Sequence, residues 1–418
     1  MTDDAHRRRF EAAAGHLDAT GRDPEAVVEA VRRFAVAVPS WALGTGGTRF
    51  GRFPGPGQPR DVYEKLADAA RVHRLTAATP AVSLHVPWDE PDDPAALRDH
   101  AAELGLGFDA VNSNTFQDPP GAQRSYRLGS FSNPDPGVRR QAVEHNLRVV
   151  EVGRALGSDA LTVWLADGTN YPGQASLARS YDRVLACLQD VYAGLPEGWR
   201  LFTEHKPYEP AFYSTVVQDW GTSLMLAQSL GDRASCLVDL GHHLPNTNVE
   251  AVVARLVSAG KLGGFHFNDS AYGDDDLTAG SIRPYQLFLV FHELALAAAE
   301  ADRAGTPFAP AYMIDQSHNL KDPVEALVQT VDQLQQAHAK ALLVDHAALE
   351  GYQDAGDVVM AERALKDAFE TDVRPLVAEA RLRGGGAADP VAAFRASGYR
   401  DRVAAERTSE AYAPPQSL

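Results

Sequence analysis

The chain has 418 residues, of which 44% are hydrophobic and 23% are charged, so it is long and apolar enough to bury a large core. Its 39 basic and 56 acidic residues leave a net charge of −17, which argues against nucleic acid as a partner. The polar start resembles no signal peptide, no stretch approaches the ~18 apolar residues of a membrane span, and two cysteines are too few for a disulfide framework. These features predict a cytoplasmic protein that binds neither membranes nor nucleic acid.

The chain begins with a helical region and then alternates between strands and helices. The first 36 residues predict two helices, and residues 35–43 predict a strand that runs into a loop rich in glycine and proline over 44–57. Seven further strands are predicted at 81–86, 108–111, 160–165, 200–206, 236–240, 263–267 and 311–314. Helices are predicted before them at 62–75, 94–103, 137–156, 174–193, 223–230, 249–259 and 284–301, and another starts at Pro323.

Eight apolar strands that alternate with amphipathic helices predict an α/β fold in which parallel strands close into a (β/α)8 TIM barrel. We expect one barrel domain with its N-terminal helices over residues 1–348 and a C-terminal helical extension over 349–418. Within the extension, residues 357–383 predict one long helix, and Asp389 with Pro390 starts a short final helix.

Four successive predicted strands end on residue types that bind metal ions. These residues are Glu204, Asp239, His266 and Asp315. The carboxyl ends of neighbouring strands meet at one face of a parallel barrel, so we expect the four side chains to converge. A single aspartate at a strand end more often caps the next helix, but four in a row favour a metal site. Three carboxylates and one imidazole suit Mn²⁺, Mg²⁺ or Co²⁺ better than a structural zinc.

A second group of candidate ligands follows closely. His242 lies three positions after Asp239, and Asp274 and Asp276 lie in an acidic loop after a glycine. This spacing predicts a second metal ion next to the first, with Glu204 as the bridging ligand. The alternative is a solvated acidic loop in which Asp276 caps a helix. Asp275 is interpreted as a neighbour of these residues and not as a ligand.

Further polar and aromatic residues lie at other predicted strand ends. Lys206 shares the inward face of its strand with Glu204, so it would contact a substrate oxygen or form a salt bridge with a nearby carboxylate. His85 ends its strand and is either a candidate acid or base or a structural histidine. Trp164 and Trp88 are either core residues or a platform for the apolar face of a sugar.

The chain resembles the L-rhamnose isomerases of the broad-specificity bacterial type in several long motifs. The motifs are Thr-Glu-His-Lys at 203–206, Val-Asp-Leu-Gly-His-His-Leu-Pro-Asn at 238–246, Gly-Gly-Phe-His-Phe-Asn-Asp at 263–269, Tyr-Gly-Asp-Asp-Asp-Leu at 272–277 and Asp-Gln-Ser-His-Asn at 315–319. The stretches at 41–50 and 164–174 are similar as well, so the resemblance runs from about residue 39 to residue 319.

The resemblance implies a metal-dependent aldose-ketose isomerase on a barrel like that of xylose isomerase, assembled as a homotetramer with two Mn²⁺ ions per subunit. It implies a structural or substrate-binding metal held by Glu204, Asp239, His266 and Asp315, and a catalytic metal held by His242, Asp274 and Asp276 with Glu204 bridging. It also implies that the loop carrying Phe50 reaches the site of a neighbouring subunit. L-Rhamnose is the implied substrate, and L-mannose, L-lyxose and D-allose present similar hydroxyls to the walls around Trp164, Trp88 and Phe50.

The expected reaction moves a hydrogen between C1 and C2 of an open-chain sugar. His85 and a water beside Asp315 are the candidates for moving the proton that opens the ring, and Lys206 would hydrogen-bond a sugar oxygen. A ketose 3-epimerase is the nearest alternative, but it would need two opposed glutamates where aspartates dominate here. A phosphodiesterase is disfavoured by the net charge. A non-catalytic sugar-binding protein that keeps its metals for stability is the alternative from another class.

Overall fold

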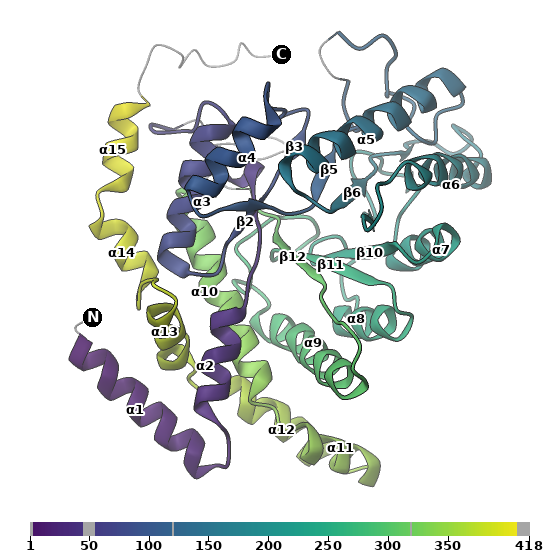
Figure 1. Cartoon of the computed structure of the whole chain (residues 1–418). Helices are drawn as coiled ribbons and strands as arrows, with labels where there is room; N and C mark the ends of the chain where they lie inside the picture. Colours follow the sequence, from purple (N-terminus) through teal and green to yellow (C-terminus); the bar gives the residue numbers. More distant parts are fainter. Residues whose placement is uncertain (1–2, 45–54, 119–120, 318–319, 408–418) are drawn as a thin grey trace.

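A computed structural model describes residues 3–44, 55–118, 121–317 and 320–407 of the chain (Figure 1). Its central feature is a seven-stranded parallel sheet with the order β12-β11-β10-β8-β6-β5-β3. The strands are β3 (His85–Val86), β5 (Val111–Ser113), β6 (Ala160–Trp164), β8 (Arg200–Glu204), β10 (Ala234–Asp239), β11 (Leu262–Phe267) and β12 (Ala311–Ile314). All seven run in the same direction, so their carboxyl ends lie at one face.

The first strand of the chain closes this sheet into a barrel. β1 (Val38–Pro39) pairs in parallel with β2 (Ala81–Ser83), which continues into β3. On the other side, the Ala37 N–H donates to the Tyr312 carbonyl at 2.8 Å, and the Ile314 N–H donates to the Ala37 carbonyl at 3.1 Å. The TIM-barrel fold expected from the alternating pattern is therefore confirmed.

The prediction of a strand over residues 35–43 is wrong for its second half, residues 40–43. Only Val38 and Pro39 are in β1, and Ser40–Leu43 form a short 3-10 helix, η1. Pro39 has no backbone N–H to donate to a neighbouring strand, so strand pairing ends there. The second and third predicted strands are each interrupted as well, the latter into β4 (Gly107–Phe108) and β5.

In the part of the chain that the structure describes, eight helices between and after the strands surround the barrel (Figure 1). They are α3 (Val62–Thr76), α4 (Pro94–Glu103), α5 (Pro136–Leu156), α6 (Leu177–Ala193), α7 (Trp220–Leu230), α8 (Val249–Ser258), α9 (Pro284–Ala304) and α10 (Pro323–Leu342). Several start with an aspartate that accepts backbone N–H bonds and is followed by proline, as Asp322 does before Pro323. β7 (Gly168–Thr169) and β9 (Ser214–Thr215) form a small antiparallel ribbon.

An apolar plug fills the barrel below its carboxyl face. It consists of Ala110, Ala160, Phe202 and Leu237. Phe202 fits because Gly263 lies opposite it, where an added Cβ would come within 2.7 Å of the ring. Thr203, which points the other way along β8, bonds Ser223 of α7 at 2.7 Å. This alternation directs Glu204 into the barrel above the plug.

The remaining helices pack outside the barrel. They are α1 (Asp3–Ala19), α2 (Pro24–Arg33), α11 (His346–Ala355), α12 (Val358–Glu370), α13 (Arg374–Arg383), α14 (Pro390–Ala396) and α15 (Tyr399–Glu406). The single helix predicted at 357–383 is wrong, because Pro375 cannot donate to a carbonyl one turn earlier and the helix breaks before it into α12 and α13. No helix in the described ranges is both long and apolar enough to span a membrane.

A buried ion pair attaches the last of these helices to the barrel. Arg407, directly after α15, donates to both oxygens of Asp68 on α3, at 2.8 and 2.9 Å, and to the Gly57 carbonyl at 2.9 Å. The Tyr399 hydroxyl bonds the same carboxylate at 2.5 Å. In Figure 1, α14 and α15 accordingly run along the side of the barrel beside α3.

Candidate active site and metal centre

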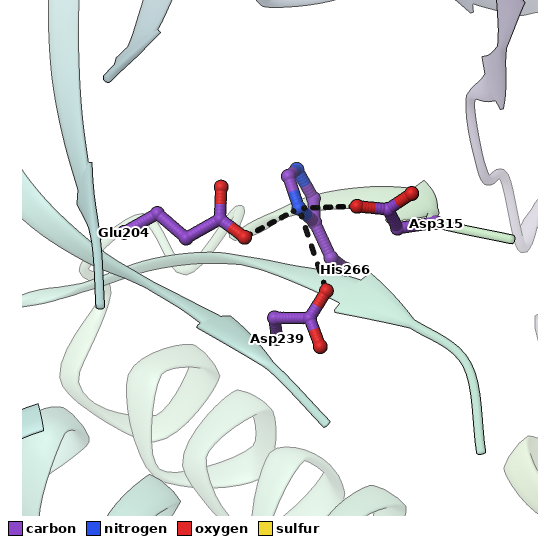
Figure 2. Close-up of side chains that lie close together, drawn as sticks. All are labelled: Glu204, Asp239, His266 and Asp315. Carbon is purple, nitrogen blue, oxygen red and sulfur yellow. Dashed lines mark hydrogen bonds and ion pairs between the residues drawn. The ribbon is translucent and has the colours of Figure 1, made fainter. Parts of the chain in front are cut away.

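Four side chains converge at the carboxyl face of the barrel (Figure 2). Glu204, Asp239 and His266 end or nearly end β8, β10 and β11, and Asp315 directly follows β12. One ligand atom of each lies within 4.8 Å of the others. The His266 Nδ1 is 3.1 Å from Glu204 Oε1, 3.8 Å from Asp239 Oδ2 and 3.6 Å from Asp315 Oδ2.

The donor set of this cluster fits a divalent metal ion. Three carboxylates and one imidazole converge, and the cluster holds no thiolate, which favours a hard or borderline ion such as Mn²⁺, Mg²⁺ or Co²⁺. Its carboxylates are also oriented by neighbours: Asp239 accepts bonds from the Gly241 N–H at 2.7 Å and from the Asn268 amide at 2.9 Å. Such outer contacts are typical of metal sites, where they fix the ligands in place.

The electrostatics of the cluster also favour a bound cation. Burial raises the pKa of Asp239, and burial with the neighbouring charges raises the pKa of Asp315 to about 7. Burial alone would lower the pKa of His266, but Glu204 and the aspartates raise it to about 9. Burial likewise opposes ionisation of Glu204, yet the adjacent imidazoles hold its pKa below the usual range. Without an ion, protons on the histidines supply the positive charge that these carboxylates require.

The second group of predicted ligands adjoins the first through His242. Its Nδ1 is 3.1 Å from the same Glu204 oxygen that His266 contacts, and its Nε2 is 2.9 Å from Asp274 Oδ1. Glu204 therefore lies between the two groups, where a bridging ligand would lie. Asp276 lines the same cavity and accepts a bond from the Ser317 hydroxyl at 3.3 Å.

Lys206 lies in the cavity and forms the salt bridge that the sequence left open as an alternative. Its ammonium pairs with Asp274 and lies 3.3 Å from Glu209. It also lies 4.9 Å from the centre of the Trp164 ring, within the range of a cation-π contact. The Lys206 ammonium therefore lies beside Asp274, one of the second group of candidate ligands.

His85 belongs to an aromatic wall of the same cavity, which has a volume of about 280 Å³. Its ring centre is 5.4 Å from that of Trp41, 4.4 Å from Trp88 and 5.6 Å from Phe116. Burial lowers the pKa of His85 to about 4, so the imidazole is neutral at neutral pH. Its Nδ1 makes no hydrogen bond to any part of the chain that the structure describes. A neutral imidazole with a free nitrogen can exchange a proton with a ligand.

Trp164 and Trp88 both line this cavity, and 39% of the Trp88 surface remains exposed. Phe50, the third residue expected to bind substrate, lies outside the described residues.

The sequence assigned no role to several residues that line the cavity. Trp41 donates from its indole N–H to Asp315 at 2.7 Å, a contact between residues 274 positions apart. Asn112 and Thr162 occupy paired positions on β5 and β6. Thr162 could have been found from strand alternation, because it lies two positions before Trp164. Phe116 follows β5 in an irregular segment, and no periodic signal marks it.

No family model matches the sequence. A probable sugar isomerase of Rhizobium meliloti (strain 1021) is 58% identical over 408 residues, which is 98% of this chain and 94% of that protein. A probable sugar isomerase of Mesorhizobium japonicum is also 58% identical, over 401 residues, 96% of this chain and 92% of that protein.

More distant relatives and the fold agree with this result. A xylose isomerase of Thermus thermophilus is 29% identical over 43% of this chain and 47% of its own. An L-rhamnose isomerase of Bacteroides thetaiotaomicron is 24% identical over 39% of this chain and 44% of its own. A solved L-ribulose 3-epimerase superposes with a TM-score of 0.55 at 18% identity, over 75% of this chain and 98% of that one, which shows a common fold. On the strength of the two relatives that match over nearly their whole length, the chain belongs to the sugar isomerase family.

Proposed function

We propose that this protein is a metal-dependent aldose-ketose isomerase that interconverts L-rhamnose and L-rhamnulose and also accepts L-mannose, L-lyxose and D-allose. The observation that carries the proposal is the convergence of Glu204, Asp239, His266 and Asp315. Three of these four, all but Asp239, line one cavity together with His85 and Lys206. Membership of the sugar isomerase family supports the reaction class, and the partial similarity to an L-rhamnose isomerase supports the substrate.

The proposed site holds two Mn²⁺ ions, or Co²⁺ or Mg²⁺ in their place. The first would be held by Glu204, Asp239, His266 and Asp315. The second would be held by His242, Asp274 and Asp276, with Glu204 shared between the two. When bound, such ions polarise the carbonyl and hydroxyl oxygens of a sugar.

The residues around the ions have separate roles in the proposed reaction. His85 is neutral, so it can take the proton from O1 of the cyclic sugar and, with a water beside Asp315, return one to O5 as the ring opens. Lys206 donates a hydrogen bond to a sugar oxygen whose charge rises during the reaction. Trp164 and Trp88 present apolar ring faces to the carbon side of the sugar.

The cavity favours a hydride shift over proton exchange through an enediol. Among the described residues that line it, the glutamates are Glu204 and Glu209, which come from the same strand end and its following loop. A ketose 3-epimerase would need two glutamates that face each other across the sugar, whereas the other carboxylates that line this cavity in the described residues are the aspartates Asp274, Asp276 and Asp315. In the isomerase reaction, the hydrogen on C2 moves with its electrons to C1, while a proton leaves O2 and another joins O1. Turnover in D₂O is therefore expected to give a product without carbon-bound deuterium, and full deuterium incorporation would refute the hydride shift.

A screen of turnover across the four aldoses, with Mn²⁺ added, tests the proposal. We expect L-rhamnose to give the highest kcat/KM, and protein freed of divalent ions is the control. Binding of these sugars without conversion of any of them would instead support the alternative of a non-catalytic sugar-binding protein. We further propose a homotetramer, which light scattering on the purified protein measures directly.

A further inference from the structure

The loop that carries Asp274 and Asp276 is closed at its base by backbone hydrogen bonds and is braced inside by a side chain of its own. At the base, Asp269 and Leu277 exchange two backbone hydrogen bonds, at 3.0 and 2.9 Å. Inside the loop, the Asp275 carboxylate accepts the N–H groups of three successive residues. These donors are Ala271 at 2.6 Å, Tyr272 at 2.9 Å and Gly273 at 3.3 Å. One side chain thus replaces the hydrogen bonds that a helix or sheet would give this segment.

The residues on either side of Asp275 have an unfavourable backbone conformation. Asp274 has a φ of 55° and Asp276 a φ of 52°, in the left-handed region that residues with a Cβ avoid. Such a conformation persists only where its surroundings impose it. The three hydrogen bonds to Asp275 contribute to holding it here, because they tie residues 271–273 to the residue that lies between Asp274 and Asp276.

The loop also fits closely against the segment that carries His242. The Asp274 N–H donates to the Gly241 carbonyl at 2.8 Å, and a Cβ at Gly241 would lie 3.2 Å from the Asp274 Cα. A Cβ at Gly273 would collide with the Tyr208 hydroxyl. The loop is therefore closely packed against this segment, and the Asp274 Oδ1 lies 2.9 Å from the His242 Nε2.

We propose that Asp275 is a positioning residue for the second metal ion. It binds no metal and no substrate; it shapes the loop so that Asp274 and Asp276 both turn their carboxylates into the cavity beside His242. This inference rests on the proposed function in one respect, which is the presence of a second ion. None of Glu204, Asp239, His266 and Asp315 lies in the loop.

Equilibrium dialysis of the full chain against Mn²⁺, with the bound metal counted by atomic emission, tests the proposal. We expect two ions per wild-type chain. In Asp275→Ala, one ion should stay as tightly bound as in the wild type, and the other should bind about 10- to 100-fold more weakly, the loss typical of removing a group that orients metal ligands. Asp275→Asn keeps one acceptor oxygen, so its affinity for the second ion should lie between that of the wild type and that of Asp275→Ala. Asp302→Ala removes the same charge from the exposed end of α9 and should bind both ions normally.

Three results would overturn the proposal: both ions bound normally by Asp275→Ala, both ions weakened equally in Asp275→Asn, or a single ion in the wild-type chain. Thermal unfolding of each variant distinguishes the loss of an ion from the loss of the fold. Sugar turnover plays no part in the measurement, so a chain that isomerises no sugar would reject the proposed function while the ion count still decides the role of Asp275.

Discussion

Stripping divalent ions from the protein is expected to destabilise it more at pH 9 than at pH 6.5. In the folded protein without metal, the carboxylates raise the pKa of His266 to about 9 from an ordinary value of 6.5. The stability that this proton confers is fully present below pH 6.5 and is lost as the pH rises through 9. Asp315 acts in the same direction, because its pKa is raised to about 7 and its neutral form is the one the folded state favours.

The size of the effect follows from the rise in proton affinity. A tenfold change in affinity corresponds to about 1.4 kcal/mol, so the shift at His266 is worth about 3 kcal/mol between pH 6.5 and 9. The pKa of His242 is raised well above its ordinary value, so His242 adds to the loss. A bound divalent ion supplies the same positive charge without titrating, and therefore removes this part of the pH dependence.

Urea unfolding at the two pH values, with and without saturating Mg²⁺, measures the effect. The loaded protein is the control for every other titrating group, so the difference between loaded and chelated protein isolates the site. We expect that difference to be larger at pH 9 by at least about 3 kcal/mol, because Asp315 and His242 act in the same direction as His266. In His266→Asn the difference should depend much less on pH. Equal stabilisation by Mg²⁺ at both pH values in the wild type would refute this account of the electrostatics.

Three substitutions test other parts of the structure. Lys206→Met should lower kcat about 100- to 1000-fold in a steady-state assay, as removal of a hydrogen bond to a developing charge does, and unchanged kcat would exclude its catalytic role. Trp41→Phe keeps an aromatic ring at this position but removes the indole N–H that bonds Asp315, so Mn²⁺ affinity should fall about tenfold or more in a metal titration; unchanged affinity would show that this bond does not orient the ligand. Arg407→Ala leaves the buried Asp68 carboxylate without its cation and should cost about 3–5 kcal/mol in urea unfolding, whereas a loss below about 1 kcal/mol would mean that water replaces the pair.

The convergence of the first four candidate ligands could be predicted because it follows from fold geometry. Glu204, Asp239, His266 and Asp315 each lie at or beside the end of a parallel strand, and neighbouring strands of a barrel keep a fixed spacing. The one-dimensional pattern of apolar runs is enough to locate such ends. The same reasoning placed Lys206 on the inward face with Glu204.

The irregular segments could not be predicted in this way. Trp41 reaches Asp315 because the chain leaves β1 at Pro39 and coils into η1, whereas the apolar pattern indicated a continuing strand. The sequence indicates only that Asp275 is a neighbour of the candidate ligands, since nothing in it shows that the carboxylate faces the backbone of its own loop. The break before Pro375 did have a sequence signal, but the amphipathic pattern on both sides concealed it.

The most direct test of the whole account is the conversion of L-rhamnose by protein freed of divalent ions, measured before and after Mn²⁺ is added back. We expect no ketose product from the chelated protein and restored turnover with Mn²⁺. Turnover that persists at the full rate without any divalent ion would contradict the central claim that the four strand ends form the metal centre of an isomerase.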